Sequence, residues 1–195
     1  MINIIPVEQK QSHKKINIYN QDMEYADSKK VAEKVERFLR LKLKKIWKID
    51  SVVSVKEKKL QYAGVDRLIT VSGQQPLRIE EKIRRITRGD ILVELIADNN
   101  YYLKSHRGLG WGLKPYSTDL LLYFFEDTET GHIFSWIKFQ KTLIDNLPKW
   151  YDLAKNNSKG FSLKKAYNKG YYSLNIVIPR TIFLKKYKKC GGIIL

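Results

Sequence analysis

The chain contains very little cysteine and histidine. Cys190 is its single cysteine, so neither a disulfide framework nor a cysteine-based zinc site can be built from this sequence. Its three histidines, His13, His106 and His132, are scattered and show no metal-ligand spacing. The scarcity of cysteine fits a reducing compartment, and we expect a cytoplasmic protein.

Long apolar runs are also missing. No stretch approaches the roughly 20 apolar residues that a membrane-spanning helix needs. The first residues lack a basic segment followed by a long apolar stretch, which a secretory leader would show. We therefore expect a soluble protein that has no membrane partner.

Acidic residues are scarce relative to basic ones. The chain has 20 Asp and Glu against 37 Lys and Arg, which gives a formal net charge of +17 and a pI near 9.8. A polyanion is the simplest partner for such a surface. An anionic membrane, or a soluble protein that is merely basic, is the alternative. With 43% hydrophobic residues in 195, the chain can bury the core of one domain over residues 1–195.

Hydrophobic periodicity predicts a helix first and then several strands. A helix capped by Asp27 or Ser28 should run to about Ile46, and a second helix is expected over 138–156 with an interruption at Pro148. The apolar stripe of the first helix should comprise Ala32, Val35, Leu39, Leu43 and Ile46. Residues 99–117 read as a loop, 159–169 as a basic segment and about 185–195 as a basic tail. We expect strands at 51–55 (with a continuation to 62 left open), 65–71, 77–83, 91–97, 119–125, 133–137 and 171–178.

The hairpin between residues 64 and 84 carries the most specific pattern. Asp66 begins one strand, and Glu80 and Lys82 lie on the next, after a turn marked by Gly73 and Pro76. Residues two apart in a strand point to the same face, so Glu80 and Lys82 project together and Glu81 points away. An acid, a hairpin and then acid-x-lysine can hold a hard metal ion beside an ammonium. Such a site can hydrolyse phosphodiesters.

Asp66, Glu80 and Lys82 resemble the motif of the PD-(D/E)xK nuclease superfamily, which includes restriction endonucleases. Val65 stands where the name of the motif has proline, a position that often varies in the superfamily. The resemblance implies an α/β fold in which helices flank a mixed central β-sheet, as in restriction endonucleases. It also implies cleavage of DNA with Mg²⁺, for which Mn²⁺ can substitute.

The resemblance assigns roles to several acids. Asp66 and Glu80 would be the metal-binding carboxylates, the backbone carbonyl of Glu81 a further ligand, and Lys82 the group that orients or deprotonates the attacking water. Glu36, on the apolar face of the first helix, is either a catalytic acid aimed at the metal or a salt-bridge partner. Glu94 interrupts an apolar strand, so it either joins the metal-binding acids or pairs with a cation.

Basic side chains around the hairpin and in the following loop are the expected phosphate contacts. They are Arg78, Arg84, Arg85, Arg88, Lys104, His106 and Arg107. Trp111 and Tyr116 could stack on bases, but a Gly-Trp-Gly segment more often fills a core, and we favour that interpretation for Trp111.

The sequence therefore predicts a Mg²⁺-dependent DNA endonuclease of a type that fits a mobile element or a phage, in a bacterial cell or a phage-infected host. A nucleic-acid-binding protein with an inactive metal site is the first alternative. The second is a basic module that binds an acidic protein. A homodimer remains open, because many enzymes that cut both DNA strands are dimers.

Overall fold

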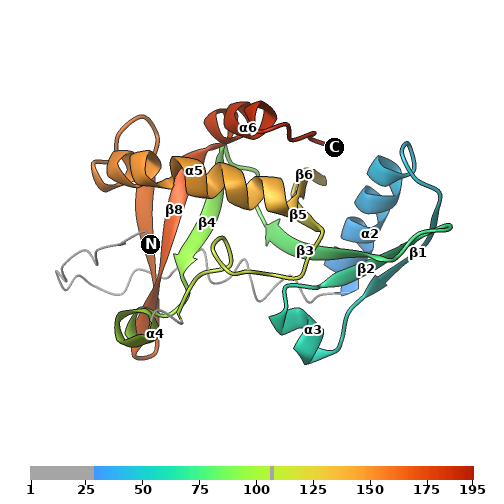
Figure 1. Cartoon of the computed structure of the whole chain (residues 1–195), viewed down its shortest axis with the longest axis horizontal. Helices are drawn as coiled ribbons and strands as arrows, with labels where there is room; N and C mark the ends of the chain where they lie inside the picture. The colour runs from blue at the N-terminus through green and yellow to red at the C-terminus, as the bar shows by residue number, and fades with distance from the viewer. Residues whose placement is uncertain (1–28, 106–107) are drawn as a thin grey trace.

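The computed structural model describes residues 29–105 and 108–195. Its helices are α2 (Lys29–Leu43), α3 (Lys58–Tyr62), α4 (Asn99–Ser105), α5 (Trp136–Lys155) and α6 (Arg180–Lys189). Its strands are β1 (Ile49–Ser54), β2 (Arg67–Val71), β3 (Leu77–Arg84), β4 (Asp90–Ile96), β5 (Leu120–Phe125), β6 (Thr130–Ser135), β7 (Ser162–Asn168) and β8 (Tyr171–Pro179). Figure 1 shows their arrangement. The expected caps Asp27 and Ser28 lie outside the described residues.

The described strands form two sheets. The central sheet has the order β1-β2-β3-β5-β6, and the second sheet has the order β4-β8-β7. In the central sheet β3 and β5 run parallel. The other neighbours are antiparallel: β1 pairs with β2, β2 with β3, and β5 with β6. The expectation of an α/β fold with a mixed sheet and flanking helices is confirmed at this level.

The central sheet is covered on both faces. Along β5, Leu122 and Phe124 join the core beneath α2, and Leu121 and Tyr123 join the core on the other face. This alternation follows from the two-residue period of a strand. A strand buried on both faces has to be apolar throughout, which explains the run Leu120–Phe125.

Helix α2 covers one face because its apolar residues recur at helical spacing. Val35, Leu39 and Leu43 are fully buried against the central sheet. Each such side chain contributes about 1.5–3 kcal/mol of burial free energy. Figure 1 shows α2 beside the β1–β3 hairpins. Val35, Leu39 and Leu43 of the expected stripe are thus the contact between this helix and the sheet, whereas Ile46 lies beyond the end of α2 and is 49% exposed.

Helix α5 connects the two sheets. It contacts β5 and β6 of the central sheet and β7 and β8 of the second sheet. It continues through Pro148, where the sequence predicted an interruption. Leu143, Leu147 and Trp150 are buried on both sides of the proline. Their packing outweighs the roughly 3 kcal/mol that an interior proline costs a helix.

Several local expectations are corrected. Residues 99–105 form helix α4 rather than a loop, because the Asp98 carboxylate accepts a hydrogen bond from the Asn100 N–H at 2.8 Å and caps the first turn. Residues 58–62 form α3 rather than a continuing strand, and the basic segment 159–169 contains β7. The expected basic tail from 185 is largely helix α6, after which Ile194 and Leu195 pack against the two cores.

Strand β4 lies where the sequence did not place it. The apolar run was expected to be a central buried strand, but β4 is the edge strand of the second sheet and pairs with β8. Its apolar residues Ile91, Val93 and Leu95 are buried in the core between the sheets and α5. In the part of the chain that the structure describes, we find no helix with the length and apolarity of a membrane span.

Candidate active site

Asp66 lies immediately before β2, at the end of the central sheet where β1, β2 and β3 meet. Its backbone N–H donates to the Ile79 carbonyl, and its own carbonyl accepts from the Val55 N–H, both at 2.8 Å. Its carboxylate accepts from the Glu81 N–H at 2.8 Å. The side chain is therefore held against β3, next to the acid-x-lysine segment.

Glu80 and Lys82 project from the same face of β3, as the strand period predicts. Their side chains form an ion pair and are 4% and 12% exposed, respectively. The Lys82 ammonium also lies 5.2 Å from the centre of the Trp111 ring. These contacts place the pair on the face of the central sheet that is opposite α2.

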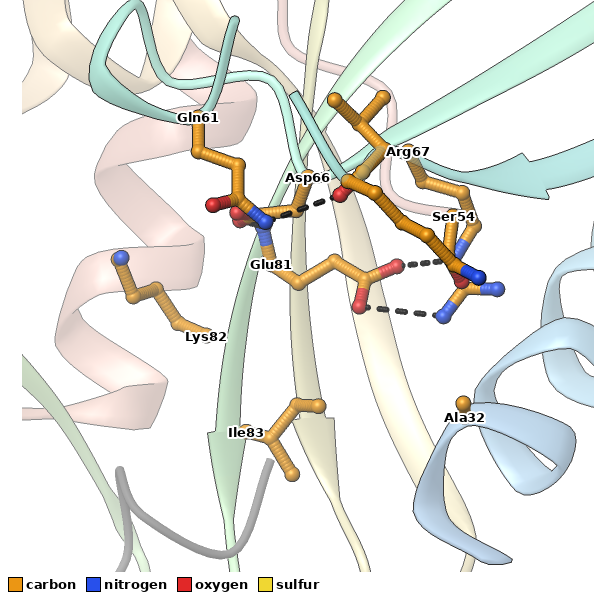
Figure 2. A pocket seen from close by; sticks show the side chains of 10 residues that line it. Ala32, Ser54, Gln61, Asp66, Arg67, Glu81, Lys82 and Ile83 are labelled. Atoms are coloured by element: carbon orange, nitrogen blue, oxygen red, sulfur yellow. Dashed lines mark hydrogen bonds and ion pairs between the residues drawn. The ribbon is translucent and has the colours of Figure 1, made fainter. Parts of the chain in front are cut away.

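Glu81 occupies the α2 face instead. It pairs with Arg67 through two hydrogen bonds, and the two side chains are 11% and 4% exposed. Figure 2 shows Glu81 directed toward Arg67 and Lys82 pointing away from this pair. We did not single out Arg67 from the sequence. Its position at an inward-facing site of β2, in phase with Ile69 and Val71, was the available signal that it needs a buried acid.

A pocket of about 510 Å³ opens at this end of the sheet. Its walls come from α2, β1, α3, β2 and β3, and they comprise Ala32, Ser54, Val55, Lys56, Gln61, Asp66, Arg67, Glu81, Lys82 and Ile83. Figure 2 shows Asp66 between the Glu81–Arg67 pair and Lys82. Asp66 and Lys82 are both lining residues, but the Lys82 side chain points away from the Glu81–Arg67 pair and is 12% exposed, and the Glu80 side chain is 4% exposed.

The buried acids and Lys82 influence one another's protonation. Burial raises the pKa of Glu80 to about 7, and the charge of Asp66 adds to the rise while Lys82 opposes it. Burial also disfavours the charged form of Lys82, but the carboxylates of Glu80 and Asp66 outweigh it and raise its pKa above the usual value. Lys82 is therefore an ammonium at neutral pH, whereas Glu80 titrates there.

The segment 108–112 lies tightly against β4 and carries Trp111 into the core. A Cβ on Gly110 would lie 2.3 Å from the Glu94 carbonyl oxygen, so only glycine permits this approach. Trp111 is 7% exposed and stacks on Phe139, with 5.8 Å between ring centres. Trp111 is thus part of the core, as we favoured from the sequence.

Tyr116 closes the same side of the site. Gly64 has a φ of +79°, and a Cβ on it would lie 2.3 Å from the ring of Tyr116. The Tyr116 ring therefore packs directly on the glycine. Burial, followed by the charge of Glu80, raises the pKa of Tyr116 to about 12. Its phenol is therefore neutral, and it lies close enough to Glu80 and Lys82 for their charges to act on its pKa.

Glu94 lies near this group but comes from the second sheet. Its carboxylate accepts from the Trp111 N–H at 3.4 Å. Burial raises its pKa, and the Trp111 hydrogen bond and the charge of Lys82 limit the rise. Among residues 29–105 and 108–195, no three His, Cys, Asp or Glu side chains are grouped so that they could hold a metal ion. Glu94 is therefore a neighbour of Lys82, and its role as a metal ligand stays a prediction.

Glu36 pairs with Arg40 at 2.9 Å, one turn further along α2, and its side chain is 38% exposed. Helix α2 contributes Ala32 to the pocket, one turn before Glu36. This geometry corresponds to the salt-bridge alternative, and a catalytic role for Glu36 stays a prediction.

The expected phosphate contacts differ in exposure. Arg78 is exposed but forms a two-bond pair with Asp119, at 3.1 and 3.0 Å. Arg84 is 5% exposed and donates to the Tyr123 hydroxyl at 3.0 Å, so it supports the interior, which corrects its assignment as a phosphate contact. Arg85 is exposed and Arg88 half-buried. His106, Arg107 and the side chain of Lys104 lie outside the described part.

Gly110→Ala is expected to destabilise the fold by about 1–3 kcal/mol, because the added methyl group meets the backbone of Glu94. Gly89→Ala is the matched control, since the described residues leave open space around its Cβ, and its effect should stay within about 0.5 kcal/mol. Urea denaturation of both variants measures the difference. Equal stability of the two would contradict the close approach of 108–112 to β4.

Comparison of the chain with models of protein families, with curated proteins and with solved structures finds no match.

Proposed function

We propose that this protein hydrolyses DNA phosphodiester bonds with the help of Mg²⁺. The observation that carries the proposal is the meeting of Asp66, Glu80 and Lys82 at one end of the central sheet, where Asp66 and Lys82 line the same pocket. The net charge of +17 supports a polyanionic substrate.

The donor set suits a hard cation. The charge of Asp66 raises the pKa of Glu80, as expected for two carboxylates close enough to share a cation. Asp66, Glu80 and the backbone carbonyl of Glu81 would hold Mg²⁺, which accepts oxygen ligands and keeps several waters. When bound, the ion supplies positive charge to the phosphate and lowers the pKa of a bound water.

Lys82 has a separate task. The carboxylates of Glu80 and Asp66 raise its pKa, so Lys82 is an ammonium that donates hydrogen bonds. Such a group orients the attacking water and offsets the negative charge that develops on the phosphate. The ring of Trp111 lies 5.2 Å from the ammonium and shields that side of it from solvent, which strengthens both interactions.

One observation favours a second function, nucleic-acid binding without cleavage. Glu80 is 3% exposed and already paired with Lys82, so a metal ion has to compete with an internal ion pair. A protein of this kind would bind DNA equally well with and without Mg²⁺, and it would leave the DNA intact.

Incubation of plasmid, linear, single-stranded and branched DNA with Mg²⁺, with Mn²⁺ and with EDTA separates the two functions. Cleavage that requires the metal supports the nuclease proposal. Retention of intact DNA on the protein under all conditions supports the binding protein instead. The preferred substrate among the four identifies the DNA structure that is cut.

Cleavage is expected to rise with pH up to about 7 and then to level off. Below its raised pKa of about 7, Glu80 is protonated and binds the cation poorly. Each further unit by which the pH is lowered should therefore reduce the cleavage rate by up to about tenfold. Raising the Mg²⁺ concentration should move the midpoint to lower pH, because the ion competes with the proton. A cleavage rate that decreases as the pH is raised from 5 to 7 would contradict this account.

A further inference from the structure

A second pocket, of about 530 Å³, lies where α2 turns into β1. It is lined by Arg40, Lys44, Lys45, Ile46, Trp47, Lys48 and Ile49. Backbone hydrogen bonds from the Lys44 N–H to the Arg40 carbonyl, at 3.1 Å, and from the Trp47 N–H to the Leu43 carbonyl, at 2.9 Å, fold this turn. Nothing in the candidate active site uses these residues.

The charge of this pocket is only partly compensated. Four of its seven lining residues are cationic, and no carboxylate is among the described residues that line it. Of the neighbouring acids, Glu36 pairs with one of the four cations, Arg40, at 2.9 Å, whereas Asp50 accepts from the Ser72 hydroxyl at 2.7 Å. Lys44, Lys45 and Lys48 are exposed, and their ammonium groups can reach an anion.

The pocket also offers apolar surface between these cations. Trp47 is half-buried and packs against the core beneath α2, which orients its ring, and Ile46 is 49% exposed. Cations that alternate with an ordered aromatic ring match a nucleic-acid chain, whose phosphates need positive charge and whose bases or sugars need a flat apolar surface.

The two pockets lie at opposite ends of α2 and β1. The candidate active site takes Ala32 from the first turn of α2 and Ser54 from the end of β1. The second pocket takes Arg40 from the last turn of α2, residues that follow Leu43, and the first residue of β1. Figure 1 shows α2 lying alongside β1. At 1.5 Å per residue, Ala32 and Leu43 are about 16 Å apart along the helix axis. That distance corresponds to about five base pairs.

We propose that the Arg40–Ile49 pocket binds the phosphate backbone of DNA at a distance from the bond that is cut. This role rests on the proposed function, because that function makes DNA the partner. Lys44, Lys45 and Lys48 contact phosphates, and Trp47 packs against the sugar or base between them. The pocket contributes affinity without sequence information.

The test compares two triple variants that lose the same charge. One carries Lys44→Ala, Lys45→Ala and Lys48→Ala, and its control carries Lys185→Ala, Lys186→Ala and Lys189→Ala, which remove exposed lysines of α6. The fluorescence anisotropy of a labelled duplex of about 20 base pairs, which at 3.4 Å per base pair extends past both pockets, is measured over a range of salt in EDTA. Circular dichroism confirms that both variants are folded.

The pocket variant should bind on the order of a hundredfold more weakly at about 0.1 M salt, and the slope of log affinity against log salt should fall by about two to three. The α6 control should change much less. Amine-reactive labelling followed by mass spectrometry should show Lys44, Lys45 and Lys48 protected when DNA is bound. Equal losses in the two triple variants would overturn the pocket and leave only net charge as the cause.

The same measurement separates this proposal from the nuclease function. EDTA prevents metal-dependent cleavage, so a selective loss in the pocket variant supports the pocket even if the wild type cuts no DNA. If the wild type cleaves DNA but the triple variant of Lys44, Lys45 and Lys48 binds DNA as tightly as the wild type, the DNA-binding role of the pocket is overturned and the nuclease proposal stands. Binding to anionic phosphatidylserine vesicles through these lysines, with no binding of DNA, would show a membrane site instead.

Discussion

Asp66→Asn is expected to reduce Mg²⁺-dependent DNA cleavage by about three orders of magnitude, the size associated with losing a group that stabilises charge in the transition state. The substitution removes the negative charge but keeps an oxygen that can accept the Glu81 N–H, now at 2.8 Å from the Asp66 carboxylate. The fold and the affinity for DNA in EDTA should therefore be retained. Cleavage assays and calorimetric titration with Mg²⁺ measure the two effects.

Asp145→Asn is the control for this prediction. Asp145 forms an exposed pair with Lys141 at 2.9 Å on α5, so removing its charge leaves the site unchanged. An exposed pair of this kind is screened by solvent and contributes little to stability. Full cleavage by Asp66→Asn, or equal losses in both variants, would show that Asp66 holds no metal.

Lys82→Met is expected to have two large effects. Cleavage should fall by about 10²–10⁴-fold, because the ammonium that orients water and offsets charge is gone. Stability should fall more at pH 8 than at pH 5, because burial already raises the pKa of Glu80 to about 7 and losing Lys82 raises it further. At pH 5 Glu80 is protonated with or without Lys82. At pH 8 the wild type keeps a charged pair that the variant lacks.

The loss of stability at pH 8 should be about 3 kcal/mol, as for other broken buried pairs. Urea denaturation at the two pH values measures it. Lys82→Arg keeps the charge, so it should retain most of the stability, but a planar guanidinium cannot replace the compact ammonium and cleavage should stay low. If Lys82 were an ordinary surface lysine, both substitutions would leave cleavage and stability unchanged.

The sequence by itself determined the local geometry around the hairpin. Side chains of a strand alternate between faces, and this period alone placed Glu80 with Lys82 and turned Glu81 away. Helical spacing likewise assigned Val35, Leu39 and Leu43 to the buried face of α2. These properties depend on neighbours within a few residues, so they can be read before the chain is folded.

Tertiary structure decided which distant segments meet. The apolar run of β4 would suit the centre of the central sheet, yet it pairs with β8, about 80 residues later. That pairing placed Glu94 against the backbone of Trp111. Strand periodicity did not reveal that Arg84 would donate to Tyr123 on β5, because that contact depends on which strand lies beside β3.

The same reason applies to both pockets. Asp66 and Lys82 were recognisable from the hairpin, but the pocket that they line also needs Ala32 from α2 and Ser54 from β1, which only the packing of the helix on the sheet brings close. We did not single out the lysines that follow α2 from the sequence. They line a pocket together with Arg40 of α2 and Ile49 of β1, which the turn between the helix and the strand brings close. Periodicity records the face that a residue presents, whereas the partner of that face is set by the free energy of packing the whole chain.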